Sequence, residues 1–133
     1  MWQLRSTAAT TRIRLLEVGL GIKGAPSTAP AFQLRRTTAV GTSSTTTAGT
    51  PHDPLDSAAL GTFDSAWSVN PTLDTPAFRE TVMATTAGGQ TFWTFYDEPI
   101  WIPASTTAGL AIVNTVATGA TLGTFVAYMV WEE

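Results

Sequence analysis

Two adjacent carboxylates, Asp97 and Glu98, lie in a stretch crowded with aromatic side chains. A pair of carboxylates walled by aromatic rings is typical of a site that cleaves glycosidic bonds by acid and base catalysis. The two catalytic carboxyl groups must face each other across that bond, whereas consecutive residues of a strand point to opposite faces. One of them could act with Asp64 or Glu80, but an Asp-Glu-Pro sequence before an apolar run predicts a solvated corner between two strands.

The single histidine, His52, is followed directly by Asp53. A catalytic triad would also need a nucleophile in contact with the histidine, and the sequence contains no nucleophile elbow. One histidine with Asp53 and Asp56 supplies too few ligands for zinc, and the spacing of a calcium-binding loop is absent. Because phosphate-binding and metal-binding motifs are also missing, we expect a protein that is not an enzyme and holds no metal or cofactor.

Length and charge limit the class of protein further. A chain of 133 residues without cysteine fits one domain that is stabilised by packing and hydrogen bonds. Residues 1–36 contain six bases and one acid, a net charge of +5, and the rest contain one base and nine acids, a net charge of −8. The cations are dispersed rather than clustered, so we expect them to meet a protein or a neighbouring subunit's acidic half, and not nucleic acid.

Alternation of apolar and polar residues with a period of two recurs along the chain and predicts β-strands. The predicted strands are residues 12–22, 31–36, 62–68, 78–85, 91–96, 100–102, 110–116 and 125–131. The adjacent Leu15 and Leu16 predict a bulge or a change of face within the first strand. The last two strands are expected to form a hairpin closed around residues 118–120.

The remaining segments predict the domain organisation. Residues 53–60, with an aspartate and a proline at the start and Gly61 after the end, predict one short helix. The Ser/Thr/Gly-rich residues 40–51 are interpreted as a mobile surface loop. We therefore expect an N-terminal arm (1–11) and a single all-β sandwich domain (12–133) with about eight strands, for which a jelly-roll-like topology is the leading candidate.

Residues 99–131 carry no charge, and part of this segment is long enough to span a bilayer. Asn114, several threonines and acidic flanks argue against a membrane span, so we expect no membrane contact. Apolar residues on both faces of the last two strands instead predict strands that are central to the sandwich or buried in a subunit interface. We expect Phe125, Tyr128 and Val130 to lie at this interface.

The order of sequence blocks resembles that of small virion proteins of tailed bacteriophages and prophages, most closely capsid decoration, or cement, proteins. The blocks are LLEVGLGI, FQLRRTTAVGT, DPLDSAALGTFDSAWS, the run from FRETVMATTAGGQ to LAIVN, and FVAYMVWEE. The resemblance covers most of the chain from about Arg12 onward and lies in texture and order of elements. It implies a jelly-roll-like sandwich, made in the host cytoplasm, that assembles as a homotrimer on the virion's capsid surface. It also implies binding to the major capsid protein and no enzymatic activity.

The N-terminal arm supplies candidate contact residues. Trp2, Leu4 and Arg5 precede a Ser/Thr/Ala spacer, and tryptophan and arginine are frequent interface anchors. Together with Arg12 and Arg14 they are the residues that we expect to bind the capsid or another partner. The arm could instead add an edge strand to its own sandwich.

Two other functions fit the sequence. A lectin-like sandwich could bind carbohydrate if Trp67, Trp93 or Trp101 were exposed as a stacking platform. The protein could also be a tail or neck component of the virion.

Overall fold

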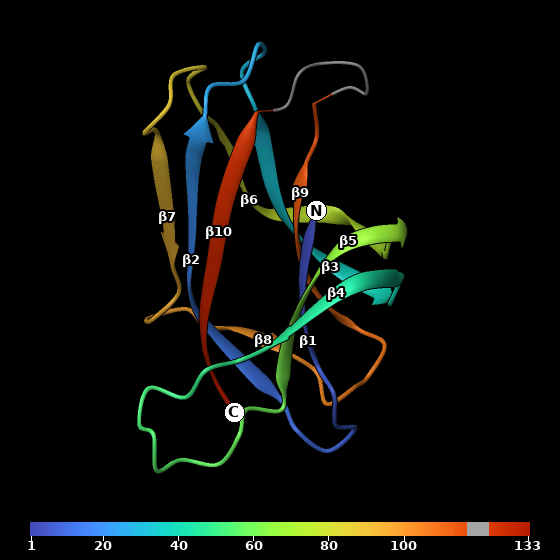
Figure 1. The fold of residues 1–133 in the computed structure, drawn as a ribbon. Helices are drawn as coiled ribbons and strands as arrows, with labels where there is room; N and C mark the ends of the chain where they lie inside the picture. The colour runs from blue at the N-terminus through green and yellow to red at the C-terminus, as the bar shows by residue number, and fades with distance from the viewer. Residues whose placement is uncertain (117–122) are drawn as a thin grey trace.

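Ten β-strands form the regular structure of residues 1–116 and 123–133, the part of the chain that this computed structural model describes. The strands are β1 (Trp2–Ser6), β2 (Ile13–Gly24), β3 (Ala31–Ala39), β4 (Thr42–Ala48), β5 (Gly61–Val69), β6 (Thr72–Val82), β7 (Gln90–Thr94), β8 (Ile100–Ile102), β9 (Gly109–Asn114) and β10 (Thr124–Glu132). They form two antiparallel sheets in a sandwich, as expected for an all-β protein (Figure 1). Within the described residues no helix is long and apolar enough to cross a membrane.

The large sheet has six strands in the order β4-β5-β1-β9-β3-β6. The small sheet has the order β10-β2-β7, and β8 pairs with β2 beyond the end of β7. At 12 residues, β2 is long enough to pair with β10 along one edge and with two short strands along the other. Figure 1 shows β7, β2 and β10 side by side, with β8 crossing near the lower end of β2.

One apolar core lies between the sheets. The inward row of β2 is buried and consists of Ile13, Leu15, Val18, Leu20 and Ile22. From β10, Phe125 packs edge-on against Phe32 of the large sheet, with the ring centroids 5.1 Å apart. Phe125 is therefore partly buried against the core, on the inward side of β10. Tyr128 and Val130 lie on the other side of the strand, because their positions differ from Phe125 by an odd number of residues.

The predicted bulge in β2 is confirmed. Along β10, Val130 pairs with Glu17 but Trp131 pairs with Leu15, so Leu16 has no partner in this ladder. The shift occurs where β2 changes its other partner from β7 to β8. The bulge thus divides the small sheet into an upper part and a lower part with different neighbours.

The predicted helix at residues 53–60 is wrong. Asp53 uses a side-chain oxygen to accept the N–H of Leu55 at 2.9 Å, and its carbonyl accepts the N–H of Asp56 at 3.1 Å. These bonds close a single turn. Since Leu55 is 92 % exposed, no apolar face packs on the sandwich to extend that turn into a helix.

The prediction of a loop at residues 40–51 is also wrong for most of its length, because Thr42–Ala48 form β4 at the edge of the large sheet. All but one of the β4 residues are exposed. Both faces of this edge strand are in contact with water, so it lacks the alternation of apolar and polar residues from which the other strands were predicted. Threonine nevertheless favours extended structure, because its branched side chain fits a pleated surface.

The last two strands do not form the predicted hairpin. β9 pairs with β1 and β3 in the large sheet, whereas β10 pairs with β2 in the small sheet. The predicted turn at residues 118–120 lies outside the described residues. β9 is apolar on both faces because it occupies the interior of a six-stranded sheet, so its composition does not require a subunit interface.

Residues 2–6, interpreted from the sequence as part of an arm, form β1 in the interior of the large sheet. β1 pairs with β5 on one side and β9 on the other, and Leu4 is fully buried in the core. This position differs both from a free arm and from the alternative of an edge strand. The first strand therefore belongs to the sandwich.

We predict that removal of residues 1–6 prevents folding, because it separates β5 from β9 and removes Leu4. The milder change Leu4→Ala should lower the free energy of unfolding by about 2–5 kcal/mol, the usual cost of emptying a buried leucine site. Val69→Ala, at an exposed position, should change it by less than about 0.5 kcal/mol. Denaturant unfolding measures all three. A stable, soluble 7–133 protein would show that β1 is dispensable.

Candidate interaction surface

The outer face of the small sheet has a glycine floor with aromatic and aliphatic side chains on both sides. Because Val18 and Leu20 point into the core, the residues between them point outward. We call this surface the small-sheet face, and it consists of Glu17, Gly19 and Gly21 on β2, Phe92 and Thr94 on β7, and Val126, Tyr128 and Val130 on β10.

Gly19 pairs with Tyr128 on one side and with Phe92 on the other. A Cβ atom added to Gly19 would lie 2.1 Å from the ring of Tyr128, so the ring occupies the space above the glycine backbone. The rings of Phe92 and Tyr128 have centroids 6.4 Å apart and an interplanar angle of 48°. Two aromatic rings from opposite sides of β2 thus meet over a position that must be glycine.

The apolar residues of this face are exposed, Phe92 by 51 %, Val126 by 54 % and Tyr128 by 44 %. A single exposed apolar side chain is common, but several on one sheet face form a patch that is typical of a binding surface. The core is filled from the other side of the same strands. These residues are therefore free to contact a partner.

The hydroxyl of Tyr128 donates a hydrogen bond to the carboxylate of Glu17. This bond, with smaller contributions from burial and from the negative charges of Glu17 and Tyr96, raises the pKa of Tyr128 above its ordinary value of 10.0. The bond holds the ring across β2. The polar end of the ring is thereby satisfied within the chain, and its apolar surface remains available.

A groove with a volume of about 960 Å³ continues the small-sheet face at its lower end. Leu16, Tyr96 and Val130 line it on the side of the small sheet, and residues 50–52 and 56–60 of the β4–β5 connection line its other side. The carboxylate of Glu133 accepts the N–H groups of Leu60 at 2.7 Å and Gly61 at 2.6 Å, which fixes one end of this connection.

The groove contains two of the residues predicted as candidates for catalysis or metal binding, His52 and Asp56. They line it together with Glu132 and Glu133. Even so, the described part of the chain contains no group of three or more His, Cys, Asp or Glu side chains that could hold a metal ion. Asp97 and Glu98 lie exposed in the bend between β7 and β8, the corner that their sequence context predicts.

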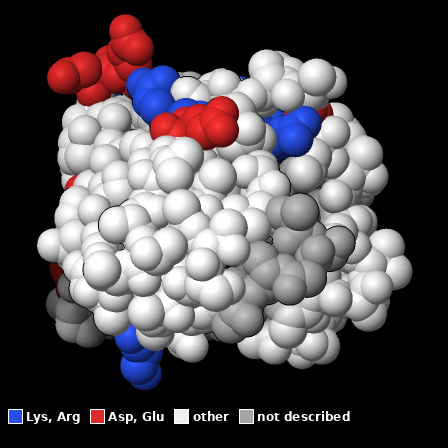
Figure 2. All heavy atoms as spheres, turned by 90° about the horizontal axis from the view of Figure 1, so that it is seen from above, with Lys and Arg blue, Asp and Glu red and all other residues white. Residues whose placement is uncertain are grey.

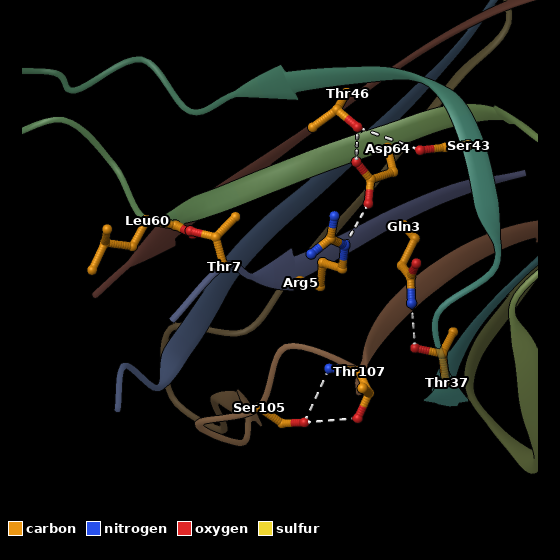
Figure 3. Close-up of polar contacts among 10 residues, drawn as sticks. All are labelled: Gln3, Arg5, Thr7, Thr37, Ser43, Thr46, Leu60, Asp64, Ser105 and Thr107. Carbon is orange, nitrogen blue, oxygen red and sulfur yellow. Dashed lines mark hydrogen bonds and ion pairs between the residues drawn. The ribbon is translucent and has the colours of Figure 1, made fainter. Parts of the chain in front are cut away.

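Arg5 is engaged within the chain. Its Nε donates to Asp64 at 2.6 Å, and Asp64 is fully buried and also accepts a hydrogen bond from Thr46 at 2.6 Å. Next to this pair, Gln3 donates to Thr37 at 2.6 Å (Figure 3). These polar side chains lie on the face of β1 opposite Leu4, and they tie β1 to the adjacent β5 and, across β9, to β3.

The other candidate contact residues divide into a buried and an exposed group. Leu4 lies in the core, and Trp2 is partly buried against it. Arg14 is half-buried and donates to Glu132 at 2.9 Å, whereas Arg12 is exposed and makes no hydrogen bond among the described residues. Only the exposed group is therefore placed to meet a partner without rearrangement.

The tryptophans proposed as a sugar platform are mostly not free. Trp67 is partly buried and donates its ring N–H to the carbonyl of Met1 at 3.1 Å, and Trp93 packs against the core. Trp101 is 42 % exposed, with the guanidinium of Arg12 4.8 Å from its ring centroid. Arg12 thus occupies one face of the most exposed ring.

Charged side chains are absent from much of one end of the sandwich. Figure 2 views the end that carries the β2–β3 and β6–β7 connections, and charged atoms there lie at the margin of the face while its centre is uncharged. Residues 24–30 and 83–89 of these connections consist of small and uncharged residues and Met83.

Sequence reasoning did not identify Phe92 or Val126 as surface residues. The signal for the face was present in VGLGI, where glycine occupies every outward position between inward Val18, Leu20 and Ile22. Comparison with protein-family models, with curated proteins and with solved structures gives no match for this chain. The geometry of the face must therefore carry the functional argument.

The raised pKa of Tyr128 can be tested directly. In Glu17→Gln the carboxylate is lost, so the pKa of Tyr128 should fall toward its ordinary value of 10.0. Ultraviolet absorbance of tyrosinate during an alkaline titration reports the change, and Tyr128→Phe identifies the signal of Tyr128 against that of Tyr96. An unchanged titration curve in Glu17→Gln would contradict the hydrogen bond.

The two ion pairs should differ strongly in their effect on stability. Asp64→Ala leaves Arg5 without its buried partner and should cost about 3–5 kcal/mol of unfolding free energy. Glu132→Ala removes the exposed partner of Arg14 and should cost less than about 1 kcal/mol. Equal losses in denaturant unfolding would contradict the buried role of Asp64.

Proposed function

We propose that this chain is a non-enzymatic structural protein of a bacteriophage virion, a decoration or cement protein that binds the major capsid protein and stabilises the head. The observation that carries the proposal is the exposed small-sheet face on a sandwich whose core is already filled. The order of sequence blocks supports a relationship with jelly-roll-like decoration proteins. Such a protein needs binding surfaces and no reaction centre.

Self-association as a homotrimer accounts for the small-sheet face. Closed cyclic rings are built from heterologous contacts, in which one surface of each copy meets a different surface of the next. The apolar face, with Tyr128 and Val130, forms one side of that contact. Its burial removes Phe92 and Val126 from water, which is favourable by about 25 cal/mol for each Å² of apolar surface covered.

We expect a particle of about three times 14.1 kDa by light scattering. Phe92→Lys combined with Val126→Lys should yield a folded monomer, because each substitution places a charge on the apolar contact. Val69→Lys, at a position that is 60 % exposed on β5, is the matched control and should remain trimeric. A monomeric wild-type protein, or a trimeric double variant, would rule out this contact.

Binding to heads is a separate test. The purified protein is mixed with empty heads built from the major capsid protein of the same virion, and sedimentation separates bound from free protein. We expect saturable binding and heads that withstand a higher temperature before they break. Absence of binding to heads, with binding to purified tails or necks, would instead place the protein elsewhere in the virion.

A further inference from the structure

Trp101 is flanked by two arginines whose charges are not matched by acids. The guanidinium of Arg12 lies over its ring, and Arg36 donates from Nη1 to its carbonyl at 2.9 Å. Within the described residues the ion pairs are those of Arg5 with Asp64 and Arg14 with Glu132. We call Arg12, Arg36 and Trp101 the Trp101 patch. It offers one guanidinium group over an exposed indole ring and a second at the backbone carbonyl of the same residue.

The β4–β5 connection presents the opposite pattern. Residues 53–56, here called the acidic tip, place Leu55 between Asp53 and Asp56, and Leu55 is 92 % exposed. The turn closed by Asp53 fixes the relative positions of the three side chains. A leucine held almost fully in water by a defined turn gains from any partner that covers it.

The tip and the patch lie at different edges of the small sheet. The connection that carries the tip is fixed to the end of β10 through Glu133, and Gly49 lies against the ring of Trp131. Trp101 is on β8, which pairs with the other edge of β2. Surfaces at opposite edges of one sheet suit a head-to-tail contact between neighbouring copies.

The acidic tip and the Trp101 patch are complementary in charge, and each combines charged groups with one apolar side chain. The tip carries an aliphatic side chain with two carboxylates near it in the chain, and the patch carries an aromatic ring with two arginines in contact with the same tryptophan residue. Arginine pairs with carboxylates in defined, two-point geometry, and indole rings are frequent anchors at the centre of interfaces. Acidic residues of the same copy leave the patch unpaired, so the complementary acids come from outside it.

We infer that the acidic tip of one copy docks on the Trp101 patch of the next copy in the ring. Leu55 covers the exposed part of Trp101, while Asp53 and Asp56 pair with Arg12 and Arg36. This contact rests on the proposed trimer and adds a charged pair of surfaces to the apolar small-sheet face. The charged pairs at the edge of this contact fix how the two copies align and speed their association.

Charge reversal on each side tests the contact. Asp53→Arg with Asp56→Arg, and separately Arg12→Glu with Arg36→Glu, should each raise the dissociation constant of the trimer by about tenfold or more, because like charges then face each other. The chain with all four substitutions should regain the wild-type constant to within about threefold, since the pairs are restored with opposite polarity. Analytical ultracentrifugation at low and high salt measures these constants.

Controls separate a lost contact from a lost fold. Arg36 also contacts Phe78, so Arg12→Glu alone is included as a variant that disturbs fewer contacts within the chain. Thermal melting followed by circular dichroism checks that each variant is folded. Glu80→Arg reverses an exposed acid on β6 and should leave the trimer unchanged. Recovery only in the four-substitution chain supports the contact.

Two outcomes would overturn the inference, and they can be told apart. If folded reversal variants stay trimeric while the Phe92 and Val126 double variant is monomeric, the trimer stands and only the tip contact is wrong. If the wild-type protein is itself monomeric, the trimer and the tip contact both fail, and binding to heads is then judged by sedimentation alone.

Discussion

The large sheet depends on the pairing of β1 with β5 and β9. Without β1, the β4–β5 pair and the three strands β9, β3 and β6 would be two separate sheets, because no other strand connects them. The two faces of β1 serve different purposes: Leu4 enters the core, while Gln3 and Arg5 bind polar partners on the other side. A slip of one residue would place Arg5 in the core, so the buried Asp64 favours one register strongly.

The small sheet follows from a different constraint, the length of β2 and the composition of its outward row. Its inward residues fill the core, and its outward glycines leave room for side chains from the strands on both sides. The aromatic rings of Phe92 and Tyr128 use this room and lie over the backbone. A partner of this face would therefore meet aromatic rings rather than the glycine backbone.

Most strands could be predicted because they have one buried face, and the period of two is visible in their residues. The prediction failed where that signal is weak. β1 has only five residues, and β4 is wet on both faces. The pairing of strands was harder to predict than their positions. β9 and β10 follow each other in the sequence and were predicted to form one hairpin, but strand pairing depends on the whole core. Among the expected interface residues, the alternation of side chains along the strand is enough to place Tyr128 and Val130 on the face opposite Phe125. The exposure of Phe92 could be recognised only from the structure.

The central position of β1 also sets an order in time. During synthesis β1 emerges first, but its partner β9 follows roughly 100 residues later, a delay of about 5–20 s at usual rates of translation. Until then the large sheet cannot close, and Leu4 stays in water. Contacts between distant parts of the sequence slow folding, so the large sheet is completed only after β9 has been made.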